Sequence, residues 1–309
     1  MELESTILFS SLSLILLLFC FKLLFQIKTS KQNLPPSPPP LPFLGHLHLI
    51  KRPIHRFYHS LSQKYGPIFS LRFGSRLVVV VSSSTAAEEC FTKNDIVLAY
   101  RPKLLIGKYL GYNWSTVVAS PYGDHWRNLR RIGAIEIFSS SRLNAFLSIR
   151  KDEVKRLLMK LSSDDNSGQE FTKVELKSLF VDLTFNNIMR MVAGKRYHGG
   201  DSVTDEGEAK EFRELMKESF ASGGVAHPGD FLPILNWIGG RSYLKKLMNL
   251  GERMDRLLQK LIDEVRKLID EHRSSRQENT SMIAHLLSLQ ESEPHYYTDE
   301  ILKGLMLVS

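Results

Sequence analysis

The sequence predicts a mainly α-helical protein with a small β-sheet near its start, behind a single transmembrane helix. Three observations support this class. After residue 124, apolar residues recur three and four positions apart, as amphipathic helices require. Residues 68–81 alternate or are β-branched, which is typical of a strand pair. An uncharged apolar run lies near the N-terminus.

Composition limits the class of function. The 309 residues carry 41 Lys and Arg against 33 Asp and Glu, so the net charge is +8. The 43% apolar and 24% charged content excludes a wholly disordered chain. The two cysteines are too few for a disulfide framework or a four-cysteine metal site. The basic residues are mixed with acids, without interleaved aromatics, so we expect no nucleic-acid partner. Attraction to membrane lipid is the better functional explanation of the positive charge.

Residues 1–27 are predicted to form an N-terminal transmembrane anchor. The stretch Ser5–Ile27 is almost uncharged and, at about 23 residues, is long enough to cross a hydrocarbon core. A cleaved signal peptide is the alternative. Two acidic residues before the run, its length and the lack of a small-residue cleavage site all disfavour it. Positive charges follow the run at Lys22, Lys28 and Lys31, which indicates a single pass with the body on the cytosolic side.

Residues 28–49 are predicted to form a proline-rich hinge. Prolines occupy most positions from Pro35 to Pro42, so this stretch can form neither helix nor central strand. A polyproline II segment is stiff and would act as a spacer after the anchor. A ligand for an SH3-type domain is the alternative.

The body, residues 50–309, is predicted to begin with a hairpin and to continue mostly as helix. The hairpin comprises Ile68–Phe73 and Leu77–Val81, and a short helix covers Ser84–Phe91. Asp124 is a candidate N-cap for the next helix. Further helical patterns cover residues 143–161, a stretch from 176 that ends near Gly194, residues 208–221 and residues 241–272.

Most templates for catalytic chemistry are absent from the sequence, including phosphate-binding loops, zinc-binding HExxH and CxxC. One cluster is informative. Trp126 and Arg130 are four positions apart and therefore share one helix face. An indole N–H and a guanidinium that converge suit a planar carboxylate. By spacing alone, a core tryptophan beside a surface arginine is the more frequent arrangement.

The order of the motifs along the chain favours a functional reading of that pair. An anchor and a proline-rich hinge precede Lys64–Phe69 (KYGPIF), Tyr100-Arg101-Pro102, the Trp126–Arg130 pair, residues 191–197 (MVAGKRY) and residues 228–233 (PGDFLP). This ordered set resembles a plant microsomal cytochrome P450, of the group that includes isoflavone hydroxylases. The resemblance runs from residue 1 to residue 309; each motif alone is weak, but the ordered set is specific.

The resemblance implies haem b as the cofactor and assigns roles to several residues. Trp126 and Arg130 would bind a haem propionate, and Arg101 would reach a propionate from the preceding loop. The loop from Lys103 to Ser120 would form the roof of the substrate pocket, and residues from about 215 to 243 would form a flexible lid. The implied pocket residues are Leu104, Leu105, Val117, Val118, Phe220 and Phe231.

The resemblance also implies that residues 50–309 are the N-terminal part of a catalytic domain, truncated at the start of the central oxygen-binding helix. The oxygen-activating residues and the cysteine ligand of the family would lie further along, and Cys90 does not match the cysteine loop. No catalytic residue and no metal ligand is therefore expected within this chain. On this interpretation the 309 residues are inactive alone and do not hold haem.

The implied parent protein is a haem-thiolate monooxygenase of the endoplasmic reticulum membrane. It would take electrons from NADPH-cytochrome P450 reductase and hydroxylate a small apolar or phenolic plant metabolite, for which an isoflavonoid is a candidate. One alternative is a haem-free, membrane-anchored helical fragment that acts only through protein contacts. Another is an unrelated anchored helical binding module.

Overall fold

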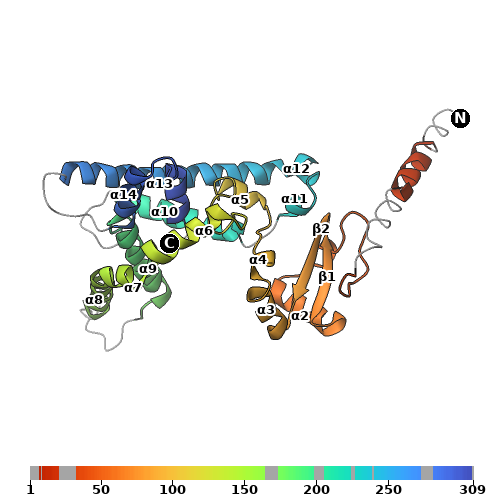
Figure 1. Cartoon of the computed structure of the whole chain (residues 1–309), viewed down its shortest axis with the longest axis horizontal. Coiled ribbons are helices and arrows are strands. Elements are labelled where there is room, and N and C mark those ends of the chain that lie inside the picture. Colours follow the sequence, from red (N-terminus) through yellow and green to blue (C-terminus); the bar gives the residue numbers. More distant parts are fainter. Residues whose placement is uncertain are drawn as a thin grey trace. The chain divides into compact units, whose positions relative to one another are not determined.

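The computed structural model describes residues 7, 9–20, 33–163, 173–197, 205–223, 227–238, 240–272 and 281–307. This part of the chain is mainly helical and contains one two-stranded sheet, which confirms the predicted class (Figure 1). The chain divides into two compact units. The first comprises Met1–Leu98 with Phe231–Leu235, and the second comprises Ala99–Asp230 with Asn236–Ser309.

The predicted anchor falls partly on residues outside those described. Residues 9–20 are helical, and their apolar side chains are exposed. The flanking residues 1–6, 8 and 21–27 lie outside the described residues. In the part of the chain that the structure describes, none of the helices combines the length and apolar character needed to cross a membrane. The anchor therefore stays a prediction.

The proline-rich segment runs beside strand β1 (Ile68–Phe73). The Pro36 carbonyl accepts the backbone N–H of Ser70 at 2.9 Å, and the Pro35 carbonyl accepts the Ser70 hydroxyl at 2.9 Å. Proline has no N–H to donate, but its carbonyl remains a strong acceptor. From Pro35 onward the hinge is thus bonded to the sheet, whereas the sequence predicts a free spacer.

His46 fixes the end of this segment. Its imidazole is buried, Nε2 lies 2.8 Å from the Pro38 carbonyl, and Nδ1 accepts the backbone N–H of Arg72 at 2.7 Å. The preceding Gly45 has a φ of +62°, and a Cβ there would lie 2.1 Å from the Arg72 carbonyl oxygen. Only glycine permits this approach, so the close contact between the segment and β1 depends on it.

The first unit is built around the predicted hairpin. β1 pairs antiparallel with β2 (Arg76–Val81), from Ile68 opposite Val81 to Phe73 opposite Arg76. Apolar side chains of β1 form a small core with Phe57, and Phe231 packs against it. The helices of this unit are η1 (Leu47–Leu49), α2 (Ile54–Tyr65), α3 (Ser84–Phe91) and α4 (Asp95–Leu98).

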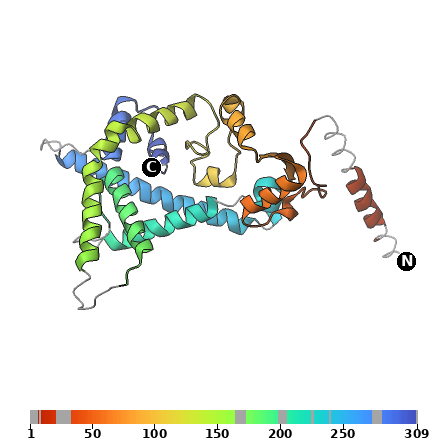
Figure 2. The same ribbon diagram turned by 90° about the horizontal axis from the view of Figure 1, so that it is seen from below.

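The second unit contains helices and no strand among the described residues, and its longest described helix, α13, runs along it (Figure 2). Its elements are α5 (Leu105–Tyr109), α6 (Asp124–Ile132), the π-helix η2 (Gly133–Ile137), α7 (Ser140–Ala145), α8 (Leu147–Ser163), α9 (Leu176–Ala193), α10 (Asp205–Gly223), α13 (Arg241–His272), α14 (Met282–Ser292) and α15 (Asp299–Met306). Two short helices, α11 (Pro228–Phe231) and α12 (Leu235–Ile238), fall where the chain passes between the units.

The core of the second unit is organised by α13, which packs against α5, α9, α10, α14 and α15. The buried positions of α13 recur at helical spacing and form an apolar stripe: Leu247, Leu250, Met254, Leu257, Leu258, Leu261, Ile262 and Val265. Burial of one leucine or isoleucine of this stripe contributes roughly 1.5–3 kcal/mol. The stripe therefore stabilises the helix and fixes the faces that its neighbours present.

Helix ends agree with the sequence in one place and differ in two. Gly194 ends α9 in the left-handed conformation, as predicted. Asp124 is not the cap of α6: Gly123 occupies the N-cap position, and Asp124 is the first helical residue, ion-paired with Arg127. The continuous pattern over residues 143–161 is interrupted at Phe146, which separates α7 from α8.

Candidate functional site

An apolar cavity of about 370 Å³ lies in the second unit. Its walls come from four places: the loop that contains α5, one face of α10, one residue of α13 and the end of α15. The lining residues are Arg101, Pro102, Leu104, Ile106, Gly107, Leu110, Gly111, Trp114, Thr116, Val118, Ala119, Met216, Ser219, Phe220, Gly223, Met254 and Leu307. A mostly apolar concavity with a few polar groups is the usual form of a site for a small organic ligand.

The loop wall has an unusual backbone. Tyr112, Asn113 and Trp114 are consecutive left-handed residues with φ of 46°, 55° and 61°. A non-glycine residue in this region costs roughly 1–3 kcal/mol, and asparagine tolerates it best. Such a turn persists only where its surroundings hold it. The Trp114 indole N–H donates to the Leu104 carbonyl at 2.8 Å and closes the loop on itself.

The base of the loop is fixed by a buried aspartate. The backbone N–H of Leu105 donates to Asp230 Oδ1 at 2.7 Å, and Asp230 Oδ2 accepts the N–H of His227 at 2.9 Å. Because Asp230 is only 8% exposed, these hydrogen bonds satisfy a carboxylate that is shielded from water. The His227 ring stacks on Tyr243 at 3.9 Å, and burial lowers the pKa of His227 although Asp230 opposes the shift.

Two polar side chains face the cavity with hydrogen-bonding capacity left over. Ser219 Oγ is buried and has no hydrogen-bond partner within the described residues. Arg101 is exposed, and its guanidinium donates to its neighbour, the Ala99 carbonyl, at 3.0 Å. A buried hydroxyl without a partner is unfavourable unless a ligand or water satisfies it.

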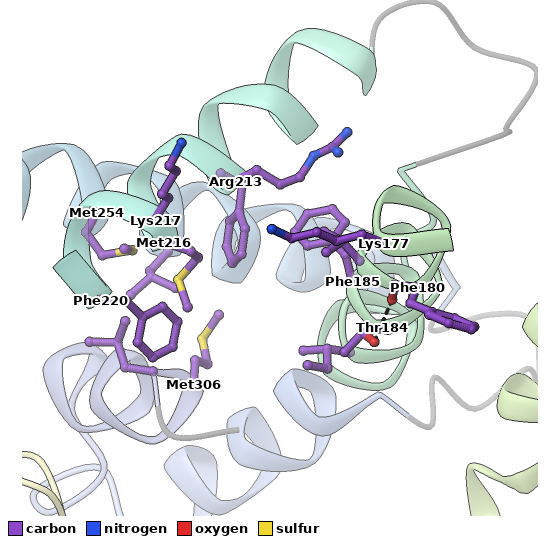
Figure 3. Close-up of a pocket in the computed structure, with 15 residues that line it drawn as sticks. Lys177, Phe180, Thr184, Phe185, Arg213, Met216, Lys217, Phe220, Met254 and Met306 are labelled. Atoms are coloured by element: carbon purple, nitrogen blue, oxygen red, sulfur yellow. Dashed lines mark hydrogen bonds between the residues drawn. The ribbon is translucent and has the colours of Figure 1, made fainter. Parts of the chain in front are cut away.

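A larger groove of about 990 Å³ adjoins this cavity along α9, α10 and α13. Its floor is apolar, and Figure 3 shows Met216, Phe220 and Met306 gathered at one end. Both hollows share Met216, Phe220, Met254 and Leu307. Phe220 is 74% exposed, so α10 presents a large apolar surface to both.

Helix α6 carries the predicted Trp126–Arg130 pair. Arg130 is exposed and makes no ion pair with any described residue, so its guanidinium is available to a ligand. The Trp126 indole N–H instead donates to the Val117 carbonyl at 3.0 Å. A half-buried indole N–H needs a hydrogen-bond acceptor, and here the acceptor is a carbonyl of the preceding loop. The pair therefore offers one free donor group, where the sequence predicts two.

The neighbouring arginines on α6 are already engaged. Arg127 pairs with Asp124 one turn earlier, and Arg131 donates to Asn128 Oδ1 at 2.7 Å. Local partners therefore separate these two arginines from Arg130. Among the described residues, Arg130 is thus the arginine of α6 without a polar side-chain partner.

The structure brings together some predicted pocket residues and not others. Arg101, Leu104, Val118 and Phe220 all line the 370 Å³ cavity. Leu105 is held by Asp230 through its backbone, and Val117 packs against the main core.

Phe231 belongs to the first unit, where its ring lies 5.4 Å from that of Phe73. It is therefore not a lining residue of the cavity. Sequence reasoning missed Met216, Ser219, Met254 and Leu307, for which helical periodicity predicts only a face and not its neighbours.

No group of three or more His, Cys, Asp or Glu side chains within the described residues could hold a metal ion. Cys20 is exposed and Cys90 is half-buried. Neither is among the residues that line the cavity. The site is thus an apolar pocket with one exposed arginine, Arg101, in its lining; Arg130 on α6 is not a lining residue, and neither arginine has a carboxylate partner within the described residues.

Comparison with known proteins identifies the family. The model of the cytochrome P450 family matches residues 35–308. The chain belongs to the cytochrome P450 family. Relatives of this P450 chain include cytochrome P450 81Q32 of Catharanthus roseus, 54% identical over 306 residues and 99% of the chain.

Two of the relatives are named as isoflavone hydroxylases. Isoflavone 2'-hydroxylase of Glycyrrhiza echinata is 48% identical over 94% of the chain, and isoflavone 3'-hydroxylase of Medicago truncatula is 49% identical over 92%. The P450 chain spans 59% of the length of the Catharanthus protein and 56% of each hydroxylase.

Proposed function

We propose that the full-length protein is a haem-dependent monooxygenase that hydroxylates a small apolar or phenolic plant metabolite, with isoflavones as the first class to test. The observation that carries this proposal is membership of the P450 family at about half identity to two isoflavone hydroxylases. The apolar cavity supports it, since its size suits a ligand of a few rings.

Arg130 and Arg101 are the residues proposed to hold the haem propionates. Both are exposed guanidinium groups without a carboxylate partner among the described residues, and a guanidinium binds a carboxylate through two parallel hydrogen bonds. Trp126 joins them only if its indole N–H leaves the Val117 carbonyl. Haem would supply the iron chemistry that activates oxygen.

The cavity walls are proposed to bind and orient the substrate. The side chains of Met216, Phe220 and Leu104 exclude water from an aromatic ligand. Ser219 Oγ is the polar group available to a hydroxyl or carbonyl oxygen of that ligand. Hydrophobic contact thus provides affinity, and one hydrogen bond provides orientation.

The proposed setting is the endoplasmic reticulum membrane, with residues 1–27 as anchor and residues 28–49 as hinge. The support is the apolar run Ser5–Ile27 and the lysines that follow it. The proposed electron donor is NADPH-cytochrome P450 reductase, because the monooxygenase reaction needs two external electrons. The membrane setting and the electron donor are both proposed for the full-length protein.

The test is expression of the full-length protein with a plant reductase in yeast microsomes. We expect NADPH-dependent conversion of unsubstituted isoflavone to a monohydroxylated product, and a thiolate-type carbon-monoxide difference spectrum. Membranes that contain the reductase alone are the control. A normal carbon-monoxide spectrum without turnover of any isoflavone would reject the substrate class, and absence of the spectrum would reject the haem enzyme.

A further inference from the structure

The Tyr112 side chain connects the loop wall of the cavity to helices α13 and α15. The Tyr112 hydroxyl donates to Asp255 Oδ1 on α13 at 3.0 Å. The same oxygen accepts Lys303 Nζ, on α15, at 2.6 Å. One carboxylate atom therefore joins the loop, α13 and α15, which are distant in the sequence.

The environment favours the protonated phenol, and the buried amine lies against a counter-charge. Burial raises the pKa of Tyr112, and the neighbouring Asp255 carboxylate raises it further, so the hydroxyl remains a donor. The Lys303 side chain is 7% exposed, and a buried ammonium requires a counter-charge. Its Nζ also lies 5.8 Å from the centre of the Tyr112 ring. The three groups therefore satisfy one another.

Tyr112 is also the first of the three left-handed residues. Within the loop, the Trp114 N–H donates to the Gly107 carbonyl at 2.8 Å and the Asn113 N–H to the Lys108 carbonyl at 3.0 Å. Gly107 permits this turn, because a Cβ there would lie 2.5 Å from Trp114 Cδ1. These bonds are local to the loop. The bond from Tyr112 to Asp255 joins the turn itself to α13, and side chains of α6 bond the loop further along, at the Ser115 and Val117 carbonyls.

The residues next to the tie line the cavity. Gly111 and Trp114 flank Tyr112, Met254 precedes Asp255, and Leu307 follows Lys303 by one helical turn. These lining residues come from the loop, α13 and the end of α15, which are the three elements that Asp255 Oδ1 joins. We infer that Tyr112, Asp255 and Lys303 act as a latch whose residues position the loop, and so set the shape of the substrate pocket. This inference rests on the proposed function, because the cavity is the pocket proposed there.

Hydrogen exchange of the full-length protein in detergent tests the latch without any turnover. In Tyr112→Phe, which keeps the ring and removes only the donor, we expect amides of residues 107–116 to exchange about tenfold to a hundredfold faster. Amides of α14 serve as the internal reference and should not change. Asp255→Asn should give the same pattern. The matched control is Asp263→Asn, the same change on the exposed side of α13.

Unchanged exchange of the loop in Tyr112→Phe would overturn the latch, as would an equal acceleration of α14, because the effect would then be global. Equilibrium dialysis with unsubstituted isoflavone provides the second reading. We expect the Kd of Tyr112→Phe to rise about threefold to tenfold and that of Asp263→Asn to stay at the wild-type value. Failure of the wild-type protein to bind isoflavone would contradict the proposed substrate class, while the exchange data still decide the latch.

Discussion

Two clusters of arginine in the second unit have opposite surroundings. Between α8 and α9, Glu153 is 2% exposed and accepts Arg190 at 2.6 Å and Arg196 at 2.9 Å. On α6, Arg130 is exposed and makes no ion pair within the described residues. The first arrangement is closed and stabilises the fold, whereas the second leaves a cation for a partner. Pairing, more than the presence of arginine, distinguishes a structural cluster from a candidate binding site.

The largest effect is expected where the cluster is closed. Glu153→Gln removes the carboxylate that both arginines share and leaves two partly buried cations without it, so we expect a loss of about 3 kcal/mol in the free energy of unfolding. Asp152→Asn is the control, because Asp152 is 37% exposed and should cost less than about 1 kcal/mol. Denaturant unfolding followed by circular dichroism measures both. Equal losses would mean that burial does not separate the two carboxylates.

The next effect should appear in haem retention and not in stability. Arg130→Ala in the full-length protein removes a charged donor from the proposed propionate site, which corresponds to about 1.5–3 kcal/mol, or one to two decades in affinity. Arg130→Lys should rescue only in part, since an ammonium cannot form the bidentate pair. Haem per polypeptide after gel filtration is the measurement. Arg131→Ala and Arg127→Ala are matched controls, and a loss of haem as large in Arg127→Ala would reject a specific role for Arg130.

A third carboxylate sharpens the comparison through pH. Burial opposes ionisation of Asp299, but hydrogen bonds from Arg266, Gln290 and Gln259 outweigh it and lower the pKa of Asp299 to about 2. Its stabilising contribution is therefore complete above about pH 4 and is lost as the pH falls toward 2.

Asp299→Asn should remove about 1–2 kcal/mol at pH 6 and flatten the acid dependence of stability between pH 4 and 2. Unfolding curves at several pH values measure this. Asp263→Asn, which removes a more exposed partner of Arg266, should leave the slope in place. A variant of Asp299 with the wild-type acid slope would show that another group titrates there.

The smallest effect concerns the cavity. Ser219→Ala removes a buried hydroxyl that has no partner among the described residues, so stability should stay the same or rise slightly. Affinity for a hydroxylated isoflavone should fall about threefold to tenfold, which equilibrium dialysis would detect. Ser222→Ala on the same helix is the control, because Ser222 does not line the cavity. Equal affinities of the two variants would remove Ser219 from the pocket.

Local patterns predict much of this fold, and long-range contacts limit the rest. The hairpin and α13 can be predicted from periodicities within single segments. The end of α9 at Gly194 can be predicted as well, because a left-handed cap depends only on the local backbone conformation. The spacing places Trp126 and Arg130 on one face of a helix, whereas the haem role of Arg130 comes from the family resemblance and stays a prediction. Trp126, by contrast, donates to a carbonyl of the preceding loop. The spacing of residues within α6 cannot predict this contact.

Tertiary placement defeats sequence reasoning in two further ways. The family resemblance implies Phe231 as a pocket residue, yet its ring packs on Phe73 of the hairpin. Tyr112, Asp255 and Lys303 have no common pattern, because a contact among three separate elements leaves no period in the chain. Propensity describes each element, but the pairing of elements depends on how the core packs.

The bonds between the proline-rich segment and β1 limit how far the first unit can stand from any point that holds the N-terminus. A free polyproline II hinge of residues 28–49 would span roughly 70 Å at about 3.1 Å per residue. The hydrogen bonds to the sheet begin at Pro35. The linker between the proposed anchor and the sheet is therefore at most residues 28–34, or roughly 20 Å. The length of this linker is thus set by the position of the first proline that is hydrogen-bonded to the sheet.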